Sequence, residues 1–222
     1  IFGANAKLNA ERVSRMARSN AYLPRGGEIR WQCDAEMLPA NSEVPAEATL
    51  HFPGGLMDFL IANLGTVPLL TPEPFHGQAD LADDKGRVEW AVAWPMRGES
   101  FTSTYCNTIP TPQGGTHESG LRTALTRSLK GFGELVGNKK ASQITSDDVM
   151  GGAQILLSLF IREPHFQGQT KEKLASAEAS RLVDTAIIVR FDFWLSSPPA
   201  AAKPLLDAII ERAEERLRAR AA

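Results

Sequence analysis

The first third of the chain alternates between short periodic segments and turn residues. Apolar positions recur at helical spacing over residues 8–23 and again over residues 56–64, which predicts two helices. Residues 28–32 and 48–52 alternate apolar and polar side chains, as half-buried strands do. Between these strands, the prolines and serine of residues 34–47 predict a loop.

A proline-rich stretch over residues 65–77 follows, and it is the candidate for a domain boundary. Beyond it, apolar side chains alternate over residues 88–94, and a second strand is predicted over residues 101–109. The turn residues 97–100 lie between the two strands. This arrangement predicts an antiparallel hairpin.

Helical spacing is strongest immediately after these strands. A helix is predicted from Thr116, whose hydroxyl is expected to cap its first turn, with an apolar stripe from Leu121 to Val136. Residues 145–148 combine a capping residue with acidic side chains and predict another helix start. The short apolar run over residues 155–161 is typical of a buried strand.

Two more helices are predicted near the end of the chain. Residues 177–195 show helical spacing, although their β-branched side chains weaken that pattern. The last helix carries an apolar stripe from Leu205 to Leu217. Its alanine- and arginine-rich end, from Arg216 onward, is expected to project as a connector.

Composition narrows the function classes without choosing among them. The chain has 222 residues, 43% of them apolar, and its net charge is −2, so no overall basic excess indicates nucleic acid. A local basic patch is compatible with that total. Cys33 and Cys106 lie far apart, which excludes a disulfide scaffold and a cysteine zinc site. A reducing, cytoplasmic setting fits best.

Neither a membrane span nor a signal peptide is predicted. The longest apolar stretch, residues 59–72, is interrupted by Asn63, Gly65 and Pro68. The first residues lack the charged start and apolar core of a signal peptide. Because the chain does not begin with Met, we expect that it begins inside a longer gene product or has been trimmed.

Familiar catalytic patterns are missing from the sequence. Residues 137–140 lack the first glycine and the hydroxyl of a phosphate loop, and no Gly-x-Ser-x-Gly elbow occurs. No metal site is expected, because no two histidines have the spacing of metal ligands on a helix. The four histidines are His51, His76, His117 and His165.

Two other segments are chemically unusual for their positions. In residues 109–118, two consecutive glycines precede a helix, where free amide groups can face a phosphate; the alternative is a tight turn with a cap. In residues 166–173, Gln169 offers an amide and Lys171 a charge suited to reach a phosphate. The alternative there is a solvated loop with ordinary surface lysines. From the residues alone, all of these interpretations stay open.

Several short motifs follow one another in a distinctive order. They are Phe52-Pro53-Gly54-Gly55-Leu56, Gly114-Gly115-Thr116-His117, Gly120-Leu121-Arg122, Asp147-Asp148 and Gln169-Thr170-Lys171. In this order the chain resembles the ATPase subunit of bacterial type IIA topoisomerases, over essentially all 222 residues. Residues 71–75 and 88–91 resemble the ATPase subunit of the topoisomerase IV branch more than that of gyrase.

The resemblance implies two domains. Residues 1–70 correspond to the C-terminal part of a GHKL (Hsp90-like) ATPase domain. Residues 71–222 correspond to a transducer domain like domain 2 of ribosomal protein S5, a β-sheet with helices on one face, which ends in a connector helix. The fold class that the resemblance implies is therefore α+β. The Asn-bearing helix and glycine-rich lid of the ATPase domain are expected upstream. No Toprim metal pattern occurs in the sequence.

The resemblance also implies a function. Proteins of this family couple ATP binding and hydrolysis to the passage of one DNA duplex through another, relaxing and decatenating DNA. By matched position, Gln169 and Lys171 contact the γ-phosphate of ATP, and Lys171 is the catalytic residue. ATP with Mg²⁺ is expected in the full-length protein, whereas this chain alone is expected to be inactive and to bind no nucleotide.

The partners follow from the same resemblance. They are a DNA duplex, the breakage-reunion subunit of topoisomerase IV, and a second copy of the ATPase subunit in the presence of ATP. No membrane partner is expected. Arg122, Arg127 and Lys130 lie off the apolar stripe of their helix and are candidates to face DNA. The alternative for these three side chains is ordinary surface solvation.

Other functions remain compatible with the sequence. One is that of the gyrase ATPase subunit, which would supercoil DNA, and another is that of a MutL-like protein. A third is that of a free-standing S5-like module that binds nucleic acid without ATP. The reaction of the whole enzyme distinguishes the gyrase subunit, and the identity of the partner protein distinguishes a MutL-like protein. The sequence upstream of this chain distinguishes the free-standing module.

Overall fold

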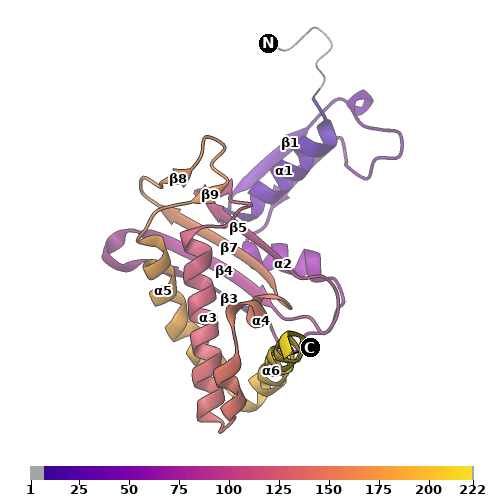
Figure 1. Cartoon of the computed structure of the whole chain (residues 1–222). Coiled ribbons are helices and arrows are strands. Elements are labelled where there is room, and N and C mark those ends of the chain that lie inside the picture. The colour runs from indigo at the N-terminus through magenta and orange to yellow at the C-terminus, as the bar shows by residue number, and fades with distance from the viewer. Residues whose placement is uncertain (1–7, 222) are drawn as a thin grey trace. The chain divides into compact units, whose positions relative to one another are not determined.

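The computed structural model describes residues 8–221 (Figure 1), and these residues form two compact units that divide between residues 62 and 63. The first unit holds helices around a two-stranded antiparallel sheet, as its periodicity predicts. Its elements are α1 (Ala10–Tyr22), β1 (Glu28–Gln32), the 3-10 helix η1 (Ala35–Met37), β2 (Glu47–His51) and α2 (Leu56–Leu64), which runs across the division.

The two strands of the first unit each bury one large apolar side chain. Trp31 of β1 and Leu50 of β2 pack with Ala21 of α1, while most neighbouring strand residues stay exposed or half-buried. The Trp31 indole N–H donates to the carbonyl oxygen of Pro45 at 2.8 Å. This bond fastens the end of the predicted loop to the sheet.

The second unit is built on a five-stranded mixed sheet. β4 pairs antiparallel with β3 and β7, whereas β5 pairs parallel with β7 and antiparallel with β6. The stretch over residues 65–77 belongs to this unit: Leu70 N–H donates to the Trp94 carbonyl oxygen at 2.9 Å. In order across the sheet, the strands are β3 (Phe75–Asp80), β4 (Gly86–Ala93), β7 (Gln154–Ile161), β5 (Phe101–Cys106) and β6 (Ile109–Pro110).

The predicted hairpin between residues 88–94 and 101–109 is wrong in its pairing. Both strands exist, as β4 and β5, but β7 lies between them (Figure 1). Side chains on both faces of β7 are buried, and such a strand is most stable inside a sheet. A crossover must therefore join β5 to the parallel strand β7, and α3 (Thr116–Leu135) lies within it.

One core lies between the sheet and two helices, α3 and α5 (Ala179–Leu195), which run along the same face of the sheet (Figure 1). The predicted apolar stripe of α3 is buried as far as Phe132, but Leu135 is 81% exposed. α3 and α5 approach closely at Gly120, where a Cβ atom would lie 2.3 Å from the Ser180 carbonyl oxygen. Glycine is therefore required at this crossing.

The core has a large aromatic content beneath the end of α5. Trp94 donates its indole N–H to the Val149 carbonyl oxygen at 3.1 Å, which ties β4 to α4 (Ser146–Met150). Phe191 stacks on Trp94 and Trp194, with ring centroids 6.0 and 5.6 Å away. The predicted strand at residues 155–161 and the predicted helix at residues 177–195 are confirmed as β7 and α5, since both bury most of their apolar side chains.

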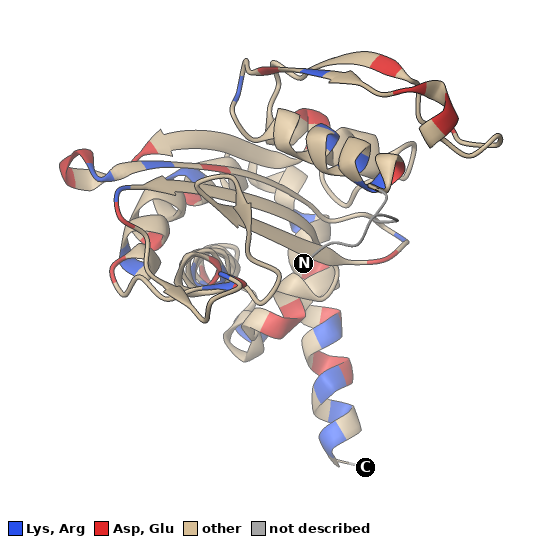
Figure 2. Ribbon diagram, turned by 90° about the horizontal axis from the view of Figure 1, so that it is seen from above, with Lys and Arg blue, Asp and Glu red and all other residues tan. Residues whose placement is uncertain are grey.

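The last helix, α6 (Pro199–Ala221), begins before its predicted stripe. Its early turns pack into the core, and charged positions then follow to the C-terminus (Figure 2). The expectation that the projecting end begins at Arg216 is wrong, because the Arg216 guanidinium bonds both carboxylate oxygens of Asp148, at 2.9 and 3.0 Å. The exposed end therefore begins after this residue. Among the described residues, no helix is long and apolar enough to cross a membrane.

Candidate functional site

The structure brings the two unusual segments of the sequence together. Residues 166–174 form a short hairpin in which β8 (Phe166–Gln167) pairs with β9 (Lys173–Leu174). The loop before α3 runs along this hairpin: Leu174 N–H donates to the Gly114 carbonyl oxygen, and Gln113 N–H donates to the Glu172 carbonyl oxygen, both at 3.0 Å. We call this contact of residues 113–115 with residues 172–174 the hairpin seam.

Gly115 is the closest point of the hairpin seam. A Cβ atom on Gly115 would lie 2.3 Å from the Leu174 carbonyl oxygen, and the residue has a φ of +140°. Both features require glycine. The same geometry makes Gly115 the residue that caps α3, so the predicted capping role of Thr116 is wrong. The Thr116 hydroxyl is buried without a hydrogen-bond partner in the described structure.

The tip of the hairpin carries the motif Gln169-Thr170-Lys171, and all three residues are exposed. Lys171 has a left-handed backbone with φ +56°, which is uncommon for a residue with a side chain. Its ammonium group lies 5.8 Å from the centre of the Phe166 ring. Within the described part of the chain, no carboxylate lies within ion-pair distance of that group. Lys171 therefore presents an uncompensated positive charge at the tip.

A buried polar network fixes the loop of the seam to the sheet. The Thr104 hydroxyl of β5 lies 2.6 Å from the Thr111 hydroxyl, which lies 3.0 Å from the His117 Nε2 atom. Burial lowers the pKa of His117 to about 4, so its ring is neutral at pH 7. The Nδ1 atom of that ring has no hydrogen-bond partner among the described residues. Sequence reasoning treated this histidine only as a motif residue and missed the network.

The three candidate DNA-facing residues line one open hollow of about 530 Å³, together with hydroxyl side chains of α3 and of residues 145–146. Two of them are paired with acids. Arg122 contacts Glu118 and Asp147 at 3.0 and 3.2 Å, and Arg127 contacts Asp184 at 3.5 Å. Lys130 has no ion pair within the described chain. The hollow is thus less positive than its cations alone indicate.

The adjacent aspartates at 147 and 148 have structural roles. Asp148 and Thr145 form a capping box at the start of α4, as the sequence predicts for this segment. Burial acts to raise the pKa of Asp148, but hydrogen bonds from Arg216 and Thr145 hold it below its usual value. Asp147 is exposed and contacts Arg122. Together the pair ties α3, α4 and α6 to one another.

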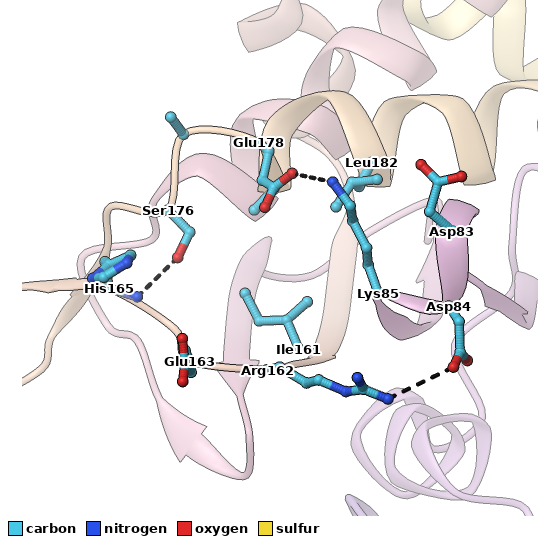
Figure 3. Close-up of a pocket in the computed structure, with 12 residues that line it drawn as sticks. Asp83, Asp84, Lys85, Ile161, Arg162, Glu163, His165, Ser176, Glu178 and Leu182 are labelled. Atoms are coloured by element: carbon cyan, nitrogen blue, oxygen red, sulfur yellow. Dashed lines mark hydrogen bonds and ion pairs between the residues drawn. The ribbon is translucent and has the colours of Figure 1, made fainter.

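Another hollow of the second unit, of about 550 Å³, lies at the base of the hairpin (Figure 3). Two ion pairs lie in this hollow: Lys85 contacts Glu178, and Arg162 contacts Asp84 at 3.6 Å. The His165 backbone N–H donates to the Ser176 hydroxyl at 2.9 Å across the hairpin base. The described residues hold no cluster of three or more His, Cys, Asp or Glu able to bind a metal.

Comparison with known proteins places this fold among the ATPase regions of type II topoisomerases. It matches the topoisomerase IV ATP-binding domain of Francisella tularensis, solved with a small-molecule inhibitor, with a TM-score of 0.79 and 26% identity over 96% of this chain and 56% of that one. It also matches the 43K ATPase domain of Thermus thermophilus gyrase B, solved with an aminocoumarin, with a TM-score of 0.78 and 26% identity over 98% and 56%.

The sequence comparisons show the family. The profile of DNA gyrase B matches residues 55–222, and the chain belongs to this family. Its relatives include the B subunit of DNA topoisomerase 4 from Caulobacter vibrioides, 50% identical over 99% of this chain, and that from Pseudomonas aeruginosa, 32% identical over 97%. The chain spans about a third of the length of these relatives, 32% and 33% respectively.

Proposed function

We propose that this chain is the part of a topoisomerase IV ATPase subunit that couples ATP binding and hydrolysis to DNA strand passage. Its family membership supports the class of protein, and its relatives named as the B subunit of topoisomerase 4 support the branch. The observation that carries the proposal is the exposed tip of the hairpin, where Lys171 has no carboxylate partner within the described chain.

The tip residues fit a terminal phosphate. Lys171 offers a single ammonium group and Gln169 an amide, and both can donate hydrogen bonds to phosphate oxygens. ATP, bound with Mg²⁺, supplies a γ-phosphate that is present before hydrolysis and gone after product release. A hydrogen bond to a charged group contributes about 1.5–3 kcal/mol, which biases a two-state hinge by about 10- to 150-fold. The contact between Lys171 and the phosphate therefore makes the conformation of this unit depend on which nucleotide is bound.

The assignment of domains belongs to the same proposal. Residues 71–222 act as a transducer like domain 2 of ribosomal protein S5, and residues 1–70 as the C-terminal part of a GHKL ATPase domain. The whole protein works in the cytoplasm with the breakage-reunion subunit on duplex DNA, and its ATPase subunit dimerises when ATP binds. The relatives are about three times as long as this chain, which leaves room for the further domains that the proposed whole protein needs.

The reaction of the complete enzyme tests this proposal. With the breakage-reunion subunit from the same source, the full-length protein is expected to decatenate linked DNA circles only when ATP is present. ATP-dependent negative supercoiling of relaxed circles would assign it to gyrase instead. Activity on DNA in neither assay, with both proteins folded, would overturn the proposed function.

We also propose that the hollow containing Arg122, Arg127 and Lys130 faces DNA. Its three cations and its hydroxyl groups can all contact phosphate oxygens, and phosphate can replace the exposed Asp147 at Arg122. Removing one phosphate contact lowers the slope of log affinity against log salt by about 0.9. We therefore expect Arg127→Ala/Lys130→Ala to lower this slope by about one to two, measured with the dimer and a short duplex.

A matched double variant provides the control for this measurement. Lys203 and Arg162 are exposed and ion-paired, and they lie outside the hollow. Lys203→Ala/Arg162→Ala removes the same charge, and its salt slope is expected to stay at the wild-type value. Equal slopes for all three proteins would exclude the hollow as a DNA-facing surface.

A further inference from the structure

Glu172, the residue directly after Lys171, is held at two points by Gln113. The Gln113 backbone N–H donates to the Glu172 carbonyl oxygen at 3.0 Å, and the Gln113 side-chain amide donates to the Glu172 carboxylate at 2.7 Å. One residue of the loop before α3 thus fixes both the main chain and the side chain of the neighbour of Lys171.

The loop that carries Gln113 is itself attached to the sheet. The Thr104 hydroxyl of β5 donates to the Thr111 carbonyl oxygen at 3.0 Å, and Gly114 N–H donates to the same oxygen at 2.8 Å. Thr104 and Thr111 are 4% and 1% exposed, so water does not compete for these bonds. Hydrogen bonds therefore hold the loop to the sheet at Thr111, and further hydrogen bonds from Gln113 of the same loop hold Glu172, the residue beside Lys171.

Lys171 depends on such external support. A left-handed backbone costs a residue with a side chain free energy, and the surrounding contacts must hold it. On its N-terminal side Gly168 adopts φ +79° without that cost, and on its C-terminal side the anchored residue is Glu172. The contact with Gln113 is the first one after Lys171 that fixes the course of the chain.

The same contact also controls charge. The Glu172 carboxylate is adjacent in sequence to Lys171 and would neutralise its ammonium group if the two paired. Its bond to the Gln113 amide directs it toward the loop, and no ion pair between Glu172 and Lys171 is formed in the described structure. Gln113 thereby leaves the charge of Lys171 free for another anion.

We infer that Gln113 and Glu172 are positioning residues for Lys171. They hold the tip of the hairpin in its left-handed turn and keep the neighbouring carboxylate away from the ammonium group. This inference rests on the proposed function, in which Lys171 contacts the γ-phosphate. In this inference Gln113 and Glu172 act through Lys171 and not on the nucleotide itself.

A double-mutant cycle in the full-length protein tests the inference. Glu172→Ala and Gln113→Ala are each expected to lower the ATPase kcat about threefold to tenfold. This is less than the effect of a buried hydrogen bond to a charged group, because water competes for the exposed bond between Gln113 and Glu172. Glu172→Gln retains an oxygen acceptor for the Gln113 amide and cannot pair with Lys171, so it is expected to retain near-wild-type kcat. In a Lys171→Met background, Glu172→Ala and Gln113→Ala should change kcat no further.

Amide hydrogen exchange gives a readout that does not depend on ATPase activity. In the absence of nucleotide, Glu172→Ala is expected to speed exchange at the Gln113 and Leu174 amides, which donate across the hairpin seam. Lys171→Met and Gln167→Ala, which changes an exposed residue of the same hairpin, should leave exchange at these amides unchanged.

The outcomes separate the inference from the proposed function. If Lys171→Met has wild-type kcat, the proposed function fails, and the inference fails with it. If Lys171→Met is impaired but the Gln113 and Glu172 variants are not, or if they lower kcat equally in both backgrounds, the inference is overturned and the proposed function stands. Unchanged amide exchange in Glu172→Ala would also overturn it.

Discussion

Replacing Lys171 by Met in the full-length protein is expected to lower its ATPase rate at least about 10²-fold, the usual effect of removing one electrostatic stabiliser from a reacting group. Methionine keeps most of the aliphatic length, so only the charge is lost. The Lys171 side chain is exposed, and the fold therefore survives the change. Steady-state ATPase rates measure the effect, and ATP-dependent strand passage should fall with it.

Lys173 is the matched control for this substitution. It is also exposed and lies two residues further on, in β9, where it pairs with Gln167. Lys173→Met removes the same charge from the same hairpin and is expected to retain a near-wild-type rate. Near-wild-type rates for both variants would remove Lys171 from the ATP site.

The buried His117 is expected to make the stability of the protein depend on pH. Burial lowers its pKa to about 4 from the usual 6.5, so the unfolded chain binds the proton more tightly than the folded one. Stability therefore falls as the pH drops below about 6.5 and levels off below about 4. Between pH 7 and a pH below about 4, the free energy of unfolding is expected to fall by about 3 kcal/mol, since each unit of pKa shift corresponds to about 1.4 kcal/mol.

Denaturant unfolding between pH 4 and 7 measures this dependence. His117→Gln retains an amide near the Nε2 position for the Thr111 hydroxyl but cannot be protonated, so it should lose most of the slope of stability against pH over this range. His165→Gln, which replaces a histidine outside the buried network, should keep the wild-type slope. A wild-type slope in His117→Gln would mean that the titration belongs to other groups.

The sequence predicted the strands and helices better than their pairing. Alternation identified β4 and β5, and helical spacing identified α3 and α5, because burial imposes these periods locally. The hairpin prediction was wrong because the local turn at residues 97–100 contains no information about β7, which begins only at Gln154. Only the continuous apolar run of β7 indicated a central strand, and a run of that kind does not identify its neighbours.

In the candidate site too, the unusual residues could be predicted from the sequence, but their contacts could not. The two glycines and the Gln-Thr-Lys motif could be singled out from the sequence because each is unusual for its position. Their contact across the hairpin seam could not be predicted, since it depends on the packing of Leu174 against Gly115. The anchoring by Gln113 and Glu172 left no sequence signal of its own, because both residue types are common on surfaces.

The central claim is that Lys171 contacts the terminal phosphate of ATP, and a comparison of two nucleotides tests it most directly. Binding of a non-hydrolysable ATP analogue and of ADP is measured by calorimetry for the full-length wild type and Lys171→Met. ADP lacks the phosphate that Lys171 would contact. We therefore predict that the variant binds the analogue about 10- to 150-fold more weakly, the range for one hydrogen bond to a charged group, and binds ADP as the wild type does. Equal changes in affinity for both nucleotides, or no change for either, would contradict this claim.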